Sequence, residues 1–422
     1  MNYDVTGTAN GYHGLFDPCT NGRIYPPCYG DGSQAEANLR YIHGSQSGTV
    51  FSYNYVRVFL SSEYVNNGFT FTAGSDVAQA GTIPGVWLSN LADFLQRAKN
   101  NGLRVVVAGE YVPANFGYAG LVCSDISRLT PVEPCSSGEN DIVFNPNYAK
   151  ALSRFYATLI SSLNGPPYID TWPDAASAIM AVDIKNELKV RSDDLPLSDH
   201  TLKRLRIDNG VYNMANPRSR QALIDDLTKN FVLSVGTAIR RADPSQTILI
   251  EASVATPQAQ NGQSGFTGAA GPSACDPKTP EFCAFPVRSA VMALHGGVSF
   301  RDVHSYQLPA PYDEGSDLAS AGLVPDAANP VPLIMGEFGA LRQLNGYANE
   351  TYTDVQSAVR ALRQHMTTSC RYGFSGWALW TWTPSNPDNA AMFWSAIFRN
   401  ADGSESNGVN GGLAIQAWPK VC

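Results

Sequence analysis

Short apolar runs alternate along this chain with longer segments in which apolar residues recur at helical spacing. The runs have the length and composition of buried strands, and they occupy residues 3–7, 54–60, 103–108, 179–187, 247–251, 300–306, 331–339 and 374–380. The helical segments cover residues 33–43, 84–100, 147–164, 217–242, 286–294 and 354–370, with a weaker one near 316–321. Ser33 is placed to cap the first helix, and Pro217 suits the first turn of a later one.

Most of the predicted strands are apolar along their whole length and do not alternate between apolar and polar positions. Such strands belong to parallel sheets that helices cover on both faces. The strand–helix units therefore predict an α/β fold, a (β/α)8 TIM barrel with long βα loops, as a single catalytic domain over residues 1–422. An open doubly wound sheet is the alternative, but the chain lacks the glycine-rich phosphate turn of such folds.

Charge limits the partners that this fold can have. The formal charge of −8 and the pI near 5.3 disfavour nucleic acid and anionic membranes. No apolar run is long enough for a transmembrane helix, and the first residues lack the apolar core of a signal peptide. The six histidines show no metal-ligand spacing, so we expect neither a metal nor a cofactor.

The eight cysteines bear on where the protein works, because most are close in sequence to another cysteine within turn-rich loops. The expected disulfides join Cys19 with Cys28, Cys123 with Cys135, Cys275 with Cys283, and Cys370 with Cys422. Free thiols are the alternative, and a zinc site is disfavoured because no two cysteines have the short spacing of zinc ligands. Disulfides and the sequon at 349–351 favour a secreted, extracellular protein, which we expect to be a monomer.

Polar and aromatic residues gather where the predicted strands end. They are Arg57, Glu110, Asn186, Glu187, Glu251, His304, Tyr306, Glu337, Trp380 and Trp382. In barrel enzymes the catalytic groups lie at the C-terminal ends of the strands. So many polar groups would build a poor core, and together they favour a carbohydrate-binding cleft.

Two of these residues, Glu187 and Glu337, are the best candidates for catalysis. A retaining glycosidase needs two carboxyl groups about 5–5.5 Å apart, one as nucleophile and one as acid/base. A single glutamate at a strand end is more often a solvated loop residue, but two of them within this set of strand-end groups favour the catalytic interpretation.

The residues around these glutamates resemble a known family. Asn186-Glu187 closes the fourth strand and 336–339 reads Gly-Glu-Phe-Gly at the seventh, as in the clan A glycoside hydrolases and most closely glycoside hydrolase family 5. That family includes cellulases, β-mannanases and related β-glycosidases. The resemblance implies that Glu187 is the acid/base, that Glu337 is the nucleophile, and that Asn186 contacts the sugar 2-hydroxyl.

Further positions match the same family. The run 56–60, Val-Arg-Val-Phe-Leu, resembles the strand that places an arginine beside the nucleophile, here Arg57. His304 and Tyr306 resemble the family's His-x-Tyr, which implies that Tyr306 bonds Glu337 and that His304 lies near the acid/base. Trp380 resembles the aromatic floor beneath the sugar, with Trp382 as the alternative and Trp377 expected only to pack.

The chain also departs from the family pattern. The third strand closes as Ala-Gly-Glu-Tyr at 108–111, where the family has a histidine, so Glu110 either fills that space or is a loop residue. Leu188 follows Glu187 where many members have proline. Asp183 and Lys185 are charged residues within the fourth strand, and a buried pair or a bulge is the account that the sequence offers.

The function favoured by these residues is a retaining β-glycosidase acting on an oligosaccharide, polysaccharide or glycoconjugate. An endo-acting β-glucanase or β-mannanase leads, and an exo-β-glycosidase or a glycolipid-cleaving enzyme is the alternative. A non-catalytic carbohydrate-binding barrel is a second class. A metal-dependent hydrolase would need paired histidines on early strands, and the serine-hydrolase motif has glutamine at its centre in 44–48. The charged segment 188–216 is expected to shape substrate choice.

Overall fold

The structure is a computed structural model. It describes residues 1–3, 15–17, 29–44, 53–60, 83–109, 140–144, 146–188, 190–191, 194–207, 210–255, 284–285, 287–305, 331–342, 352–371, 373–382, 393–399 and 405–408. The predicted site residues Glu110 and Tyr306 lie outside these ranges, as does the weak helix predicted near 316–321.

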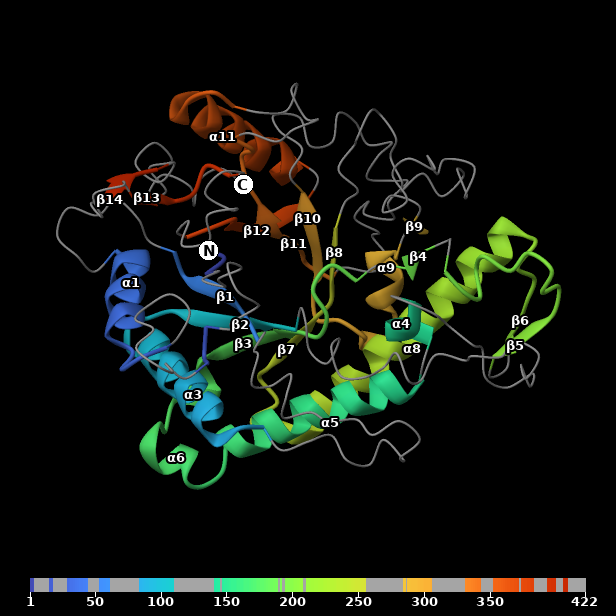
Figure 1. Ribbon diagram of the computed structural model, residues 1–422, viewed down its shortest axis with the longest axis horizontal. Coiled ribbons are helices and arrows are strands. Elements are labelled where there is room, and N and C mark those ends of the chain that lie inside the picture. Colours follow the sequence, from blue (N-terminus) through green and yellow to red (C-terminus); the bar gives the residue numbers. More distant parts are fainter. Residues whose placement is uncertain are drawn as a thin grey trace.

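Parallel strands run through the centre of the molecule in two four-stranded sheets (Figure 1). The first sheet has the order β1 (Tyr55–Phe59), β2 (Arg104–Ala108), β3 (Ile179–Asp183) and β7 (Leu249–Glu251). The second has the order β12 (Phe374–Leu379), β11 (Leu333–Phe338), β10 (Arg301–Ser305) and β8 (Ser253–Ala255). Every pairing within these two sheets is parallel, as the apolar strands predict.

Two seams join the sheets into a ring. At one seam, β7 and β8 are separated by Ala252 alone, so that one interrupted strand pairs with β3 on one side and β10 on the other. At the other seam, Asn2 forms a parallel bridge with Arg57 of β1, and its backbone bonds to Leu379 at 3.0 Å and Trp382 at 2.9 Å. The described strands thus follow the order of a (β/α)8 barrel, with the bridge at Asn2 in the place of its first strand.

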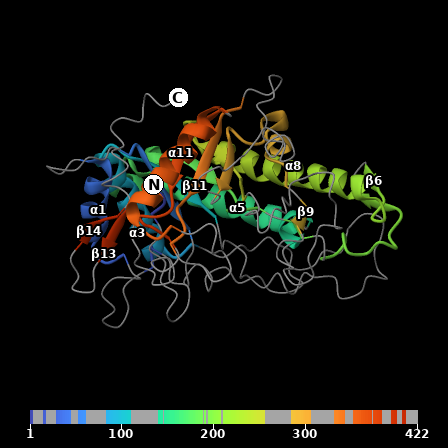
Figure 2. The same cartoon turned by 90° about the horizontal axis from the view of Figure 1, so that it is seen from above.

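The long helices lie outside the strands, within one or two residues of their predicted bounds. They are α1 (Ser33–His43), α3 (Gly85–Asn100), α5 (Pro146–Leu163), α8 (Pro217–Ala242) and α11 (Val355–Arg371). Their apolar stripes join the strands' outer side chains in one hydrophobic cluster. Helices α5 and α8 run side by side (Figures 1 and 2), and in Figure 1 they lie beneath the strands.

Helix starts depend on residues that periodicity does not reveal. The expected cap at Ser33 was wrong, because Gly32 is the N-cap and the Ser33 amide bonds to Asp31 Oδ1 at 2.9 Å. Pro217 does occupy the first turn of α8, and the Asn216 side chain caps that helix by accepting from the amides of Arg218 and Ser219.

Short helices connect the main elements. They are α4 (Asp141–Phe144), α6 (Tyr168–Thr171), α7 (Ala175–Ala178), α9 (Ser289–Met292) and the 3-10 turn Leu294–Gly296. The helix predicted at 286–294 is therefore shorter than its pattern indicates.

Small antiparallel pairs complete the described elements. β4 (Val190–Arg191) pairs with β9 (Ala284–Phe285), β5 (Leu205–Ile207) with β6 (Gly210–Tyr212), and β13 (Ile397–Arg399) with β14 (Glu405–Asn407). The β5–β6 hairpin lies at one end of α8, away from the central strands (Figures 1 and 2). Tyr212 holds it there by donating to Asp226 Oδ2 at 2.7 Å.

The cysteines are almost all outside the described ranges. Cys370, at the end of α11, is the one cysteine within the described ranges, and it is disulfide-bonded. The four predicted pairings therefore stay predictions. No helix within the described ranges is long and apolar enough to cross a membrane.

Candidate active site

Alternation along the strands divides apolar from charged side chains. Successive residues of a strand point to opposite faces, so Val56 and Val58 pack outward against the helices while Arg57 points the other way. Charged residues of β3, β7, β10 and β11 lie on that same inner side and are buried. They are Asp183, Glu251, Asp302, His304 and Glu337.

Arg57 is the centre of this group. Its guanidinium donates to Glu337 Oε1 at 2.6 Å and to Asp183 Oδ2 at 2.6 Å. It also donates to Asn186 Oδ1 at 2.5 Å. The Arg57 pKa is raised because the charges of Glu337 and Asp183 outweigh the effect of burial. The predicted neighbourhood of Arg57 and Glu337 is present in the structure, and Asp183, which the sequence left unassigned, is the second carboxylate of the arginine.

The backbone turns sharply where β3 ends. Glu187 has φ 46°, in the left-handed region that residues with a side chain rarely adopt. The amides of Glu187 and Leu188 both bond to Ser253, to its Oγ and its carbonyl oxygen, each at 2.9 Å. Proline at position 188 would have no amide proton and could not make the hydrogen bond that Leu188 donates to the Ser253 carbonyl oxygen.

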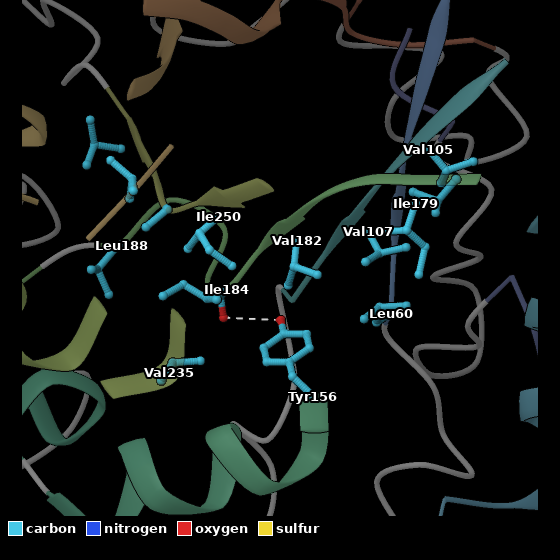
Figure 3. Close-up of a cluster of buried hydrophobic side chains, with 14 of the residues drawn as sticks. Leu60, Val105, Val107, Tyr156, Ile179, Val182, Ile184, Leu188, Val235 and Ile250 are labelled. Atoms are coloured by element: carbon cyan, nitrogen blue, oxygen red, sulfur yellow. Dashed lines mark hydrogen bonds between the residues drawn. The ribbon is translucent and has the colours of Figure 1, made fainter. Parts of the chain in front are cut away.

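A hydrophobic floor supports this turn from below (Figure 3). Val182, Ile184, Leu188 and Ile250 lie together in one cluster of buried side chains. Tyr156 of α5 donates to the carbonyl oxygens of Asp183 and Ile184, each at 3.2 Å. Residues predicted to continue the fourth strand to 187 thus form a supported turn, because the strand ends at Asp183.

His304 lies between the two candidate catalytic carboxylates. Its Nδ1 is 3.1 Å from Glu187 Oε1 and 3.5 Å from Glu337 Oε2, and its Nε2 is 3.6 Å from Asp302 Oδ2. Burial would lower the His304 pKa, but the nearby carboxylates of Glu337, Asp302 and Glu187 raise it to about 10. The ring is therefore an imidazolium at neutral pH.

The pKa values of the deeper carboxyl pair, Glu251 and Asp302, are shifted in opposite directions. Burial and the neighbouring Asp302 raise the pKa of Glu251 well above its usual value. Burial would also raise the pKa of Asp302, but Glu251 and His304 beside it lower it to about 2. Burial therefore favours the neutral form of Glu251, and the side chain does not line a cleft as the sequence suggested.

Glu187 and Glu337 differ in exposure. The side chain of Glu187 is 37% exposed, whereas that of Glu337 is 4% exposed and paired with Arg57. Ligand atoms of Glu187, His304 and Glu337 all lie within 4.8 Å of one another. Among the described residues this is also the set that could hold a metal ion.

The aromatic candidates separate by burial. Trp382 is 2% exposed and packs against Tyr41 of α1 at 5.4 Å between ring centroids, which leaves almost none of its surface for a ligand. Trp380 is half-buried and meets the Phe59 ring edge-on at 5.7 Å. Trp377 packs as expected and donates to Ser369 Oγ at 2.9 Å. Trp380 therefore stays the candidate for sugar stacking.

Sequence reasoning missed three residues that hold the site together. Ser253 binds the turn at Glu187, Asp302 accepts from the Gly336 amide at 2.5 Å, and Asn2 donates to the Gly336 carbonyl at 2.8 Å. A signal existed for two of them, because Ser253 follows Glu251 by two positions and Asp302 precedes His304 by two. Residues two apart on a strand share a face.

Comparisons with known proteins bear on the fold. No family model and no curated protein sequence matches the chain. Among solved structures, an exo-β-1,4-mannosidase from Opitutaceae bacterium strain TAV5 matches with a TM-score of 0.50 and 16% identity over 100% of this chain. The chain shares the fold of that enzyme. It spans 59% of the enzyme's length.

Two β-mannanases also match, with lower scores. The endo-1,4-β-mannanase of Eisenia fetida has a TM-score of 0.44 and 15% identity over 90% of this chain and 84% of its own. The β-1,4-mannanase of the sea hare Aplysia kurodai has a TM-score of 0.40 and 15% identity over 83% and 81%. At the level of the fold, the resemblance to clan A glycoside hydrolases and the predicted (β/α)8 class are confirmed.

Proposed function

We propose that this protein is a retaining β-glycosidase in which Glu337 is the nucleophile and Glu187 the acid/base. The observation that carries the proposal is the proximity of the two carboxylates, whose nearest ligand atoms lie within 4.8 Å. Inverting glycosidases hold their carboxyl groups about 6.5–9.5 Å apart to admit a water molecule, whereas retaining enzymes hold them about 5–5.5 Å apart. The close pair favours double displacement.

The environments of the two glutamates suit different steps. Glu337 is buried and paired with Arg57, so its carboxylate is poised to attack the anomeric carbon and form a glycosyl ester as the C–O bond to the leaving group breaks. Glu187 is more exposed and would donate a proton to the departing oxygen, then take one from the water that cleaves the ester. The Asn186 amide nitrogen is available to donate to a sugar 2-hydroxyl, because its oxygen already accepts from Arg57.

Within this class we propose an endo-acting β-glucanase or β-mannanase, with an exo-β-glycosidase or a glycolipid-cleaving enzyme as the alternative. The solved enzyme that shares the fold is named a β-1,4-mannosidase, so β-mannosides belong beside β-glucosides in any first panel. The protein is incubated with both series of aryl glycosides, with glucans and mannans, and product lengths are measured.

Variants decide whether the named residues do the work. Glu337→Ala and Glu187→Gln should each lower turnover of an unactivated glycoside by several orders of magnitude, on the order of 10³ or more. Azide should rescue Glu337→Ala and yield a glycosyl azide of inverted configuration. A panel in which no glycoside is cleaved would support the non-catalytic carbohydrate-binding barrel, and near-normal rates in either variant would refute its assignment.

A further inference from the structure

Ser253 is a buried residue that makes several hydrogen bonds to the turn after β3, and the proposed catalytic steps give it no role. It lies on β8, directly after the interruption at Ala252, and has no exposed surface. A hydroxyl has one proton to donate and two lone pairs that accept. The Ser253 Oγ uses both functions, accepting from the Glu187 amide at 2.9 Å and donating to Asp183 Oδ2 at 3.0 Å.

The backbone of Ser253 repeats these contacts. Its carbonyl oxygen accepts from the Leu188 amide at 2.9 Å, and its own amide donates to Asp183 Oδ1 at 3.2 Å. One residue of β8 therefore binds the turn both before and after Glu187. Asp183 in turn binds Arg57, and Arg57 binds Glu337, so Ser253 is linked through these two residues to the candidate nucleophile.

We propose that Ser253 is the positioning residue of the acid/base: its hydroxyl and carbonyl fix the left-handed turn that aims Glu187 at the leaving group. This inference rests on the proposed function. The left-handed φ of 46° at Glu187 is an independent observation, since a residue with a side chain keeps this conformation only where its surroundings enforce it. The described contacts of the Glu187 and Leu188 amides are those to Ser253.

Ser253→Ala removes the acceptor of the Glu187 amide without changing the Glu187 side chain. A misplaced acid slows cleavage when the leaving group needs a proton. It has little effect on the rate when the leaving group departs as a stable anion. We expect kcat/KM to fall roughly 10–100-fold for a phenyl glycoside, as a small misplacement of a catalytic group would cause. For the 2,4-dinitrophenyl glycoside of the same sugar we expect a change within about threefold.

Two further variants separate positioning from folding. Ser253→Thr keeps the hydroxyl and should restore much of the phenyl glycoside rate. Ser369→Ala is the matched control, because Ser369 is also buried and its Oγ also donates and accepts, to the Met366 carbonyl at 2.8 Å and from Trp377 Nε1 at 2.9 Å. It should leave the ratio of the two glycoside rates unchanged.

Amide hydrogen exchange gives a readout that does not depend on activity. Ser253→Ala should speed exchange at Glu187 while residues of α8 keep wild-type protection. Equal losses on both glycosides, or unchanged exchange at Glu187, would overturn the positioning role. If the wild-type protein cleaved no glycoside, the proposed function would fall, and the exchange at Glu187 would still decide whether Ser253 fixes the turn.

Discussion

At the scale of single residues, the buried charges of the site converge on Arg57. Its guanidinium is 1% exposed and joins Asp183 and Glu337, which are also buried. Removing one partner of a buried ion pair leaves an uncompensated charge in a medium that solvates it poorly. The stability of the protein and the geometry of the candidate nucleophile therefore depend on the same side chain.

We predict that Arg57→Ala lowers the free energy of unfolding by about 3–5 kcal/mol, because two carboxylates lose their partner. Arg57→Lys should recover little of this, since one ammonium cannot reproduce the planar array of donors. Urea unfolding measures the change, and Arg40→Ala is the control because its ion pair with Glu36 is exposed. A stable Arg57→Ala protein would contradict the charge network.

The pH dependence of stability follows from His304. Its pKa in the folded protein is about 10, against about 6.5 in an unfolded chain. Because the folded state binds the proton more tightly, the stabilisation is complete below about pH 6.5 and is lost as pH rises through about 10. The free energy of unfolding should fall more steeply across this window in wild type than in His304→Gln. Equal slopes from urea unfolding would show that the imidazolium is not held by its neighbours.

At the scale of elements, β2, β3 and α5 meet at a point that admits only glycine. A Cβ on Gly109 would lie 2.1 Å from the Tyr156 hydroxyl, which is bonded to the end of β3. We predict that Gly109→Ala lowers the free energy of unfolding more in the wild-type protein than in the Tyr156→Phe variant, which lacks the hydroxyl. The coupling should be about 0.5–3 kcal/mol in a double-mutant cycle measured by thermal unfolding. Additive effects would mean that the two residues do not meet.

The sequence predicted the long helices closely because their signal is local. The apolar spacing within α1, α3 and α8 indicates where each helix begins and ends. Each of these helices begins within one residue of its predicted start. Strand ends are different, because Ile184 continues the apolar pattern past the true end at Asp183. Ile184 is buried there under the turn, and the residue that fixes the turn, Ser253, is distant in sequence.

The candidate site divides in the same way. Arg57, Asn186, Glu187, His304 and Glu337 could be named from short motifs, and the structure brings them together. Asp183, Ser253 and Asp302 could not be given partners, because their partners lie on other strands and are chosen by the register between strands. The prediction that Glu251 lines the cleft was wrong. A position at the end of a strand does not tell whether a side chain lines a cleft or is buried beneath it.

At the scale of the whole molecule, Asn2 completes the ring of strands. Its side-chain nitrogen Nδ2 donates to the carbonyl oxygens of Gly336 at 2.8 Å and Ala378 at 3.2 Å. Its side-chain oxygen accepts from Arg57 at 3.2 Å. We predict that Asn2→Ala lowers the free energy of unfolding by about 1–3 kcal/mol, because buried groups are left unsatisfied. Amide exchange at Arg57 and Trp382 should also rise.

The control for this prediction is Asn90→Ala, which loses a hydrogen bond to the Phe16 carbonyl in the outer layer of helices. It should leave exchange at Arg57 and Trp382 unchanged. If Asn2→Ala also left those amides protected, the ring would not depend on the first strand.

Covalent trapping tests the central claim most directly. The protein is incubated with activated 2-deoxy-2-fluoro-β-glucoside and 2-deoxy-2-fluoro-β-mannoside, which slow both steps of a retaining glycosidase but the second one more. Mass spectrometry of the intact chain and its peptides should then show one added glycosyl group on the peptide that contains Glu337, with no label in Glu337→Gln. A label on another residue, or hydrolysis of the parent glycosides without any trapped intermediate, would contradict the account.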